Sequence, residues 1–503
     1  MTLDRRIFIM SALVVMVSIV FGGATKLGYL GDVVAQIFAI PLLLLSLWYW
    51  FDHKSQPVVR PAFLIIFIAT TAAVFAIHLT PVPPGWLPQT GPHGHAQNGL
   101  KLIDHGTTWR QLSLSPHQTW ATAASLLVPT AVFAGVCQLD ARARVALLNL
   151  ILFLGAISLF IGILQVMQGP ESALRFYQYT SRTDAVGLFA NRNHFAALLY
   201  SVVMLTSVWL VAKSSQALVL GPNNAKAVAI FLIALIFVLA FLAGLALARS
   251  RAGIILATAA IGATFCLATF NRHTSSTPMS PGRNAGKRIW FMGLCILLIV
   301  AANFGLTRIL SRFEATPLQE LRPALSSTSL DTAYQALPFG SGPGSFVPVY
   351  ASVEHASDLS SNYANRAHNE FAEVLLETGL AGTILFAMFA YWFAMRTYAV
   401  WRHVNCEKVE IDQTHTLLQR SATIVILLLL VHCLVDYPLR TTALGALFGY
   451  CCALLISPNR NAHNKLFHQL SAPQRGRQSL AGDIEWPDAW KKPITNRENP
   501  TRS

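Results

Sequence analysis

Residues 227–248 read AVAIFLIALIFVLAFLAGLALA, an uninterrupted apolar run without a charged side chain. At about 1.5 Å per residue, a helix of this length just exceeds the ~30 Å hydrocarbon thickness of a bilayer. A helix satisfies its own backbone hydrogen bonds, which is what the interior of a bilayer requires. This run therefore predicts a transmembrane helix.

Similar apolar blocks recur along the whole chain. Of its 503 residues, 54% are hydrophobic and only 12% are charged, whereas soluble globular proteins carry about 25% charged residues. This composition excludes an ordinary soluble or disordered protein and predicts an all-α, polytopic membrane protein with about 12 transmembrane helices. The predicted spans are residues 7–23, 33–51, 62–79, 119–137, 145–167, 194–212, 227–248, 254–270, 289–306, 371–395, 420–435 and 441–456.

The basic residues predict the orientation of these spans. The net charge is +14, and placing the N-terminus in the cytoplasm puts most Lys and Arg residues in cytoplasmic segments, as the positive-inside rule requires. An even number of spans then leaves both termini cytoplasmic, with residues 457–503 forming a polar, disordered tail. The positive charge is thus explained by membrane lipids, and no nucleic-acid partner is expected.

The basic residues on the opposite, outer side are nearly all arginines. Arginine presents a planar fork that matches phosphate oxygens, so an anionic ligand at the outer face is one hypothesis. The alternative is that individual arginines snorkel or pair with acidic residues of the loops. Two outer loops are long, residues 80–118 and residues 307–367, and loops of this length are usually functional.

The strongest motif closes the second loop and consists of His368-Asn369, nine residues, and Gly379-x-x-Gly382. Read as one helix, it places His368 near the water interface, about 16 Å above Gly379, with both glycines permitting close helix packing. Histidine is suited to proton transfer near neutral pH, and the alternative is an interfacial histidine that caps a helix. Three glutamates form a polar stripe that enters the membrane: Glu370, Glu373 and Glu377.

Two further segments on the outer side contain turns. Gly340-Ser-Gly342-Pro-Gly344 is a glycine-rich turn whose backbone N–H groups could cradle a phosphate, although a purely structural turn is the alternative. The segment from His432 to Arg440 joins the last two spans, and its Asp436 and Arg440 could either pair with each other or serve a ligand.

Two predicted helices begin with arginine on the outer side. Arg192-Asn193-His194 opens the sixth span, and Arg251 opens the eighth. The N-terminus of a helix attracts anions through its free N–H groups and its dipole. Both segments are therefore candidate anion sites.

Taken together, these motifs resemble the bacterial O-antigen ligase and O-antigen polymerase superfamily over roughly residues 120–455. The resemblance implies a lipid-linked, GT-C-like glycosyltransferase of the bacterial inner membrane, with its active site facing the periplasm and with no metal or other cofactor. It implies transfer of a glycan from undecaprenyl diphosphate to lipid A-core by a ligase, or to another lipid-linked glycan by a polymerase of O-antigen or exopolysaccharide.

The resemblance also implies roles for individual residues. His368 corresponds to the proposed base, and five arginines correspond to diphosphate-binding residues: Arg192, Arg251, Arg322, Arg366 and Arg440. Supporting roles fall to Asn193, His194, Gly342, Gly344, Asn369, Glu373 and Asp436. The predicted organisation is an N-terminal part, residues 1–118, a ligase-like domain, residues 119–456, and the tail.

Two other classes of protein remain open from the sequence. A transporter of lipid-linked glycans would favour internal repeats and charges lining both vestibules, whereas the ionisable residues crowd on one face. A catalytically inert assembly partner would tolerate His368→Ala without loss of product.

Overall fold

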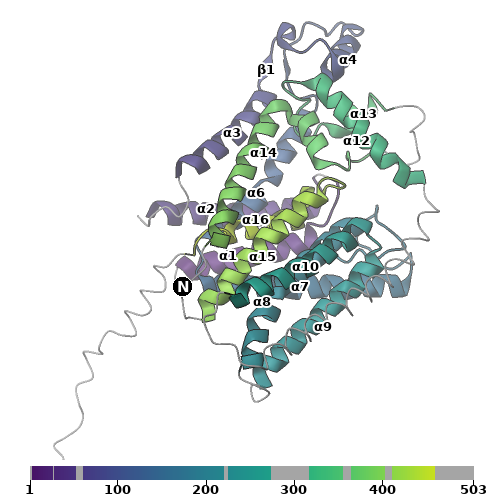
Figure 1. The fold of residues 1–503 in the computed structure, drawn as a ribbon. Helices are drawn as coiled ribbons and strands as arrows, with labels where there is room; N and C mark the ends of the chain where they lie inside the picture. Colours follow the sequence, from purple (N-terminus) through teal and green to yellow (C-terminus); the bar gives the residue numbers. More distant parts are fainter. Residues whose placement is uncertain are drawn as a thin grey trace, which may run out of the picture. The chain divides into compact units, whose positions relative to one another are not determined.

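The computed structural model describes residues 3–26, 28–52, 61–219, 225–273, 317–354, 364–402 and 410–458. Figure 1 shows that this part of the chain is almost entirely helical. Strands β1 (Pro81–Val82) and β2 (Arg110–Gln111) pair antiparallel in one short hairpin. The helices are α1 (Leu3–Phe21), α2 (Leu30–Asp52), α3 (Pro61–Leu79), η1 (Pro84–Trp86), α4 (Gly91–Lys101), α5 (Pro116–Ser125), α6 (Leu127–Cys137), α7 (Ala141–Gln168), α8 (Arg192–Val219), α9 (Ala225–Ala248), α10 (Arg251–His273), α12 (Pro317–Ala336), α13 (Phe346–Ala351), α14 (Glu370–Arg402), α15 (Glu410–His432), η3 (Pro438–Arg440) and α16 (Thr442–Leu454).

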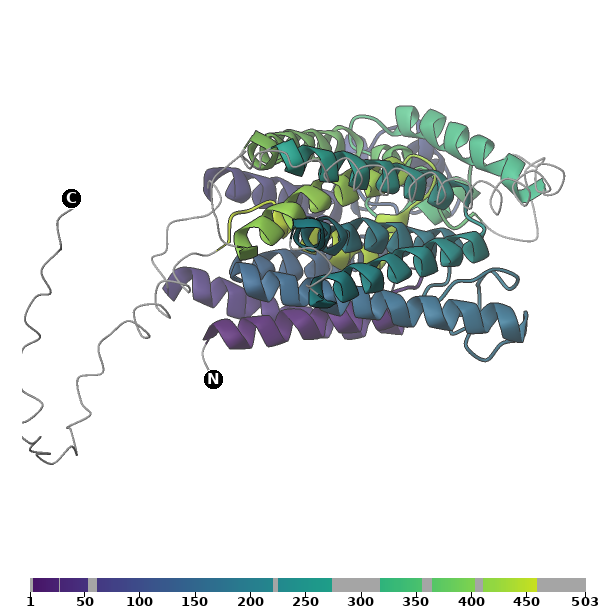
Figure 2. The ribbon, with the colours of Figure 1, turned by 60° about the horizontal axis from the view of Figure 1, so that its bottom comes forward.

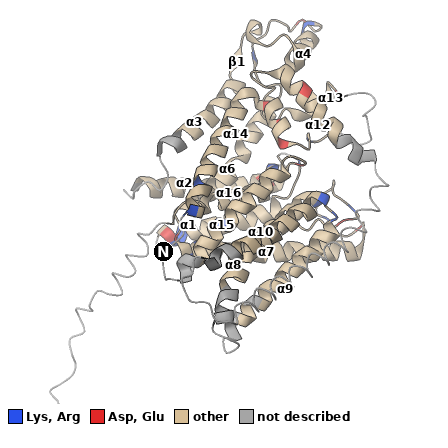
Figure 3. Ribbon diagram, in the orientation of Figure 1, with Lys and Arg blue, Asp and Glu red and all other residues tan. Residues whose placement is uncertain are grey.

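Eight stretches within the described part are long and apolar enough to cross a membrane, judged by length and composition. Shorter apolar helices lie at Ile66–Leu79 and Thr442–Leu454. Figure 3 shows that the charged residues of the long helices lie mostly near their ends. The prediction of a helical, multi-span membrane protein is thereby confirmed, whereas the count of about 12 spans and the GT-C-like architecture stay predictions. The predicted span at residues 289–306 lies outside the described residues.

Helices α8 and α16 form the centre of the packed bundle. Helix α8 contains the most enclosed of the eight candidate spans, Arg192–Ala212, of whose apolar window nearly nine-tenths is buried, and α9, α10 and α15 pack around it. Helix α16 packs against α1, α6 and α15. Figure 2 shows these long helices running side by side.

In lipid the hydrophobic effect does not drive helices together, so their association depends on close van der Waals packing, which small residues permit. A Cβ at Gly155 of α7 would lie 2.9 Å from a methyl carbon of Val202 in α8. A Cβ at Gly449 of α16 would lie 2.5 Å from the carbonyl oxygen of Pro129 in α6. Larger side chains at these two positions would force the helices apart.

A group of shorter elements, which we name the outer lobe, lies beside the N-terminal part of α14 (Figure 1). It is formed by α4, the hairpin, α12 and α13, and α12 packs against both α4 and α14. The described residues of the predicted loop 307–367 are therefore largely helical, while residues 307–316 and 355–363 lie outside the described part.

Candidate active site

The loop that precedes α8 is held in place by α7. The side-chain oxygen of Gln165 accepts the backbone N–H groups of Val186 at 3.1 Å and Gly187 at 2.9 Å, and its amide nitrogen donates to the Gly187 carbonyl at 2.8 Å. Gly187 has φ +56°, and a Cβ there would lie 2.4 Å from the Ser158 hydroxyl oxygen. This fixed loop delivers Asn193 and its neighbours to the start of α8.

The start of α14 differs from the predicted continuous helix. The helix begins at Glu370, and Asn369 caps it by accepting the backbone N–H of Phe371 at 3.1 Å. His368 lies in the preceding loop with φ +52°, a conformation that costs a side-chain-bearing residue of order 1–3 kcal/mol and often marks functional sites. Gly379 interrupts the helix with φ 56° and ψ −141°. The interpretation of residues 368–379 as one unbroken helix was therefore wrong.

Three elements distant in sequence meet at the buried carboxylate of Asp436. Asn193 of α8 donates its side-chain amide to Asp436 Oδ2. His368 Nδ1 lies 3.2 Å from Asp436 Oδ1, and His194 Nε2 lies 3.9 Å from the same oxygen. The Asp436 side chain is 1% exposed and that of His368 is 20% exposed, so the histidine is the member that solvent or a substrate can reach.

Tyr437 completes this group, which we name the Asp436 cluster (Asn193, His194, His368, Asp436 and Tyr437). Its ring lies 4.8 Å from that of His194 and 5.2 Å from that of His368, measured between centroids. Burial and the Asp436 carboxylate raise the pKa of Tyr437, so its hydroxyl stays protonated. Sequence reasoning missed this residue, although it adjoins Asp436 in a segment that was singled out.

Glu373 fixes the residues that lead into His368. Its Oε1 accepts Arg366 Nη1 at 2.7 Å, and its Oε2 accepts the backbone N–H of Ala367 at 2.9 Å. Arg366 and Glu373 are both buried. One carboxylate of α14 thus holds the two residues directly before the histidine.

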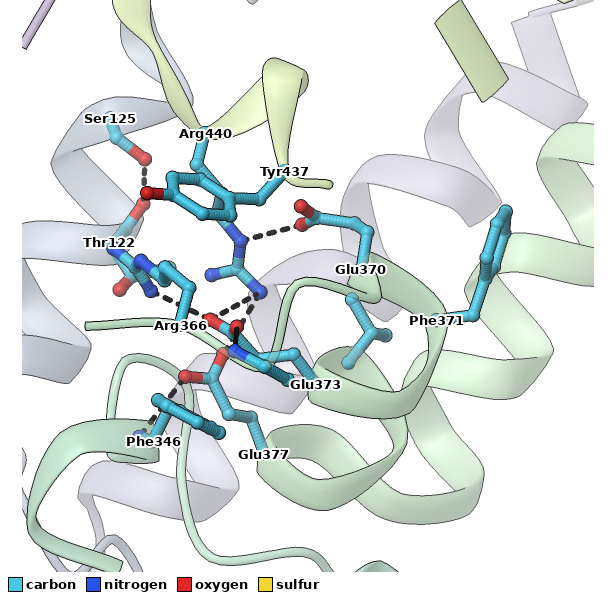
Figure 4. A network of polar contacts seen from close by, with 12 residues as sticks. Thr122, Ser125, Phe346, Arg366, Glu370, Phe371, Glu373, Glu377, Tyr437 and Arg440 are labelled. Carbon is cyan, nitrogen blue, oxygen red and sulfur yellow. Dashed lines mark hydrogen bonds and ion pairs between the residues drawn. The ribbon is translucent and has the colours of Figure 1, made fainter. Parts of the chain in front are cut away.

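Arg440 ties the loop that carries Asp436 to the same face of α14, as Figure 4 shows. Its Nε donates to Glu370 Oε1 at 2.5 Å, and its Nη2 lies 3.2 Å from Glu377 Oε2 and 3.6 Å from Glu373 Oε1. Burial alone would lower the pKa of Arg440, but the three carboxylates raise it well above its ordinary value. We name these contacts the arginine–glutamate network (Arg366, Arg440, Glu370, Glu373 and Glu377).

The alternative that Asp436 and Arg440 serve chiefly each other is not the arrangement found. Asp436 contacts α8 and His368, whereas Arg440 contacts the glutamates of α14. Each residue therefore anchors the loop between α15 and α16 to a different helix, which brings the starts of α8 and α14 together.

The glycine-rich turn packs into the break in α14. The backbone N–H of Ser341 donates to the Leu376 carbonyl at 2.9 Å, and that of Gly342 donates to the Glu377 carbonyl at 2.8 Å. A Cβ at Gly379 would lie 2.2 Å from the Pro338 carbonyl oxygen. Gly379 therefore admits the backbone of this turn, which corrects the expectation that it serves packing between helices.

The carboxylate of Glu377 in α14 accepts a hydrogen bond from the residues that follow the glycine-rich turn. The backbone N–H of Phe346 donates to Glu377 Oε1 at 3.3 Å. Gly344 lies against α5, where a Cβ would stand 2.6 Å from the Thr122 hydroxyl oxygen. Gly342 thus bonds to α14 and Gly344 packs against α5 in this structure, and a direct phosphate contact at either glycine stays a prediction.

A second group of charges surrounds Asp184, beside the start of α8. Arg192 Nη1 lies 2.6 Å from Asp184 Oδ2, and Arg249 Nη1 lies 3.5 Å from Asp184 Oδ1. Arg175 donates to the Asp184 carbonyl at 3.0 Å. We name these four residues the Asp184 cluster; its three guanidinium groups exceed the charge of its one carboxylate. Sequence reasoning missed Asp184.

The remaining predicted site residues are placed as follows. Arg251 is the first residue of α10, and Ser250 and the left-handed residue Arg249 separate α10 from α9. The side chain of Arg322 lies outside the described residues, and its role stays a prediction. Among the residues that the structure describes, no group of three or more His, Cys, Asp or Glu side chains is arranged to hold a metal ion.

A comparison with protein families identifies the central part of the chain. The O-antigen ligase family matches residues 234–387. This match covers less than a third of the chain and supports its resemblance to the O-antigen ligase superfamily. Members of this family are glycosyltransferase-like membrane enzymes that act on lipid-linked glycans and acceptors. The matched segment of this O-antigen ligase-like chain contains His368 and Glu373. No curated protein matches the chain.

Proposed function

We propose that this chain transfers a glycan from undecaprenyl diphosphate to an acceptor hydroxyl at the periplasmic face of the inner membrane, as an O-antigen ligase does. The observation that carries the proposal is the contact between His368 and Asp436, within a family of glycosyltransferase-like enzymes. Both residues lie where α8, α14 and the loop before α16 meet, and His368 is partly exposed there.

His368 supplies the base in this proposal. When Nδ1 donates its hydrogen to the Asp436 carboxylate, Nε2 carries the lone pair that accepts the proton of the acceptor hydroxyl. The acceptor oxygen bonds to the anomeric carbon of the glycan while the bond from that carbon to the phosphate oxygen breaks. Undecaprenyl diphosphate leaves with the electron pair of that bond.

The departing diphosphate needs cationic partners near the start of α8. Arg192, Arg249 and Arg251 lie at the N-termini of α8 and α10, where the helix dipoles also favour an anion. Arg366 and Arg440 are engaged by glutamates, so we assign them to positioning His368 and Asp436. In this proposal, one set of arginines binds the diphosphate and the other positions His368 and Asp436, so residues of the chain supply both roles.

A reconstituted transfer assay tests the proposal. The full chain in proteoliposomes is given an undecaprenyl-diphosphate oligosaccharide, with or without lipid A-core, and products are separated by mass. We expect transfer by wild type and a loss of about 10²- to 10⁴-fold in His368→Ala, the range typical of a lost general base. His117→Ala is the matched control, because His117 is exposed on α5 and has no assigned role.

The products distinguish the reactions within the superfamily. A glycan on lipid A-core identifies a ligase, and longer lipid-linked chains without that acceptor identify a polymerase. Equal rates in His368→Ala and His117→Ala would remove His368 from the chemistry. Absence of transfer with every acceptor, while labelled donor crosses the membrane, would instead identify a transporter.

A further inference from the structure

The outer lobe contains a cavity of about 530 Å³ that opens to solvent. This volume falls in the range of about 300–1,000 Å³ that is typical of small-molecule sites. Residues of α4, β2, the start of α5 and α13 line it. None of its lining residues belongs to the Asp436 cluster, the Asp184 cluster or the arginine–glutamate network.

The wall of the cavity combines one large aromatic side chain with several polar ones. Trp109 is 67% exposed at its rim. Three polar neighbours make no hydrogen bond or ion pair through their side chains with any residue in the described ranges: His95, Arg110 and Gln111. These donors are therefore available to a ligand; His95 lies on α4, and Arg110 and Gln111 form β2, which pairs with β1.

The floor of the cavity is tied to the glycine-rich turn. His93 Nε2 lies 2.9 Å from the Gly340 carbonyl oxygen, and the backbone N–H of Leu114 donates to the Ser341 carbonyl at 2.9 Å. Burial lowers the pKa of His93, which keeps its ring neutral near pH 7. Because the same turn is bonded to α14, the cavity is preformed and rests on the scaffold that positions His368.

We propose that this cavity binds sugar rings of a glycan substrate, at a distance from the reacting bond. A sugar ring has apolar C–H faces and a rim of hydroxyl groups, which match the exposed face of Trp109 and the donors of His95, Arg110 and Gln111. None of the described residues that line the cavity carries a carboxylate, so this lining does not suit a cationic ligand. That the ligand is a glycan rests on the proposed function. The cavity itself and the three side chains without partners are observed independently of that function.

Such a subsite gives the enzyme preference for long glycans. Binding energy from sugar rings far from the reacting centre can hold the substrate in place. A glycan that extends to the outer lobe would gain this energy, and one that ends near His368 would not. The expected signature is a KM that rises when the subsite is damaged, with kcat little changed.

The binding test uses the full chain in nanodiscs and the free oligosaccharide released by mild acid from the lipid-linked glycans of the source bacterium. We expect the wild type to bind the oligosaccharide in isothermal calorimetry, and we expect the affinity of Trp109→Ala to be lower by about tenfold or more. Arg110→Gln should also weaken binding. Trp86→Ala is the matched control, since Trp86 is 77% exposed on the same lobe but does not line the cavity.

His368→Ala should bind the oligosaccharide as wild type does. Binding without transfer, lost in Trp109→Ala, would support the cavity while contradicting the proposed function. Transfer without binding, or equal binding by Trp109→Ala and Trp86→Ala, would overturn the cavity proposal and leave the proposed function standing.

Inhibition of transfer by the same oligosaccharide identifies the origin of the bound glycan. Competition with the undecaprenyl-linked donor assigns the cavity to the donor glycan, and competition with the acceptor assigns it to the acceptor. Inhibition that persists unchanged in Trp109→Ala would place the inhibitory site elsewhere and contradict the proposal.

Discussion

Asp436 is the residue whose contacts define the candidate site, because it touches both α8 and His368 while fully enclosed. In the proposed mechanism, its charge fixes which ring nitrogen of His368 carries hydrogen and stabilises the imidazolium that would form on proton transfer. Asp436→Asn removes that charge while nearly preserving side-chain shape. We expect kcat to fall about 10²-fold or more with a small change in KM, measured in the reconstituted transfer assay.

Asp331→Asn serves as the control for this substitution, since Asp331 lies exposed on α12. Thermal unfolding in detergent separates a catalytic effect from a loss of structure. A variant Asp436→Asn that unfolds like wild type and transfers at the wild-type rate would contradict the positioning role of the carboxylate.

At the residue level, local sequence identified some members of the site better than others. His368, Asp436 and Arg192 stand in short motifs with unusual residue types, and each lies in or beside a charged cluster of the structure. Asp184 stands in no such motif, and Tyr437 was overlooked although it directly follows Asp436. Their importance comes from partners in other helices, and a single sequence contains no information on which helices meet.

Among the helices, too, some features could be predicted from the sequence and others could not. Apolar length predicted the long helices well, because lipid leaves the backbone few alternatives to a helix. The course of α14 could not be predicted in the same way. Its break at Gly379 exists because the turn at residues 338–344 enters there, and glycine spacing alone is equally compatible with helix packing.

The C-terminus of α16 depends on polar side chains from three other helices. Its last carbonyls have no partners within the helix; Gln419 of α15 donates to Leu454 at 2.8 Å, and Arg396 of α14 donates to Leu455 at 2.9 Å. The fully buried Arg144 of α7 donates to Ile456 at 2.6 Å. These bonds fasten α16 to the bundle at the end away from the Asp436 cluster.

Arg144→Leu should therefore destabilise the fold. Arg144 also donates to the carbonyls of Cys137 and Leu139, both at 3.0 Å, so its removal leaves buried acceptors unsatisfied. We expect a loss of about 3 kcal/mol or more, seen as a lower Tm in detergent. The exposed neighbour Arg142 provides the control Arg142→Leu, with an expected change within about 0.5 kcal/mol. Equal Tm values for the two variants would contradict this role.

For the molecule as a whole, the contacts define two opposite ends of the bundle. The starts of α8 and α14 meet the end of α15 at the Asp436 cluster. The start of α7 and the end of α14 meet the end of α16 at the other end of the bundle, through Arg144 and Arg396. Because α16 leads from the first end to the second, its last residue, Leu454, lies at the end of the bundle opposite to His368.

The described helices also place residues 273 and 317 toward different sides. Helix α10 runs parallel to α8, since Gly253 lies against Ala196 and the Thr264 hydroxyl lies 3.8 Å from the sulfur of Met204. It therefore ends away from the Asp436 cluster, whereas α12 packs against α4 and α14 in the outer lobe. The sequence predicts one span between them, at residues 289–306, which lies outside the described part.

Reporter insertions into the full chain test this topology. The positive-inside rule predicts that the end of the bundle with residue 458 faces the cytoplasm, so alkaline phosphatase should be active when inserted after the exposed residue Asp104 and inactive after His273 or residue 458. Green fluorescent protein at the same three positions is the control and should give the reciprocal pattern, because it does not fluoresce after export in an unfolded state. Activity of the phosphatase at both Asp104 and residue 458 would mean that the tail and the outer lobe share a side, which the contacts at the two ends of α16 exclude.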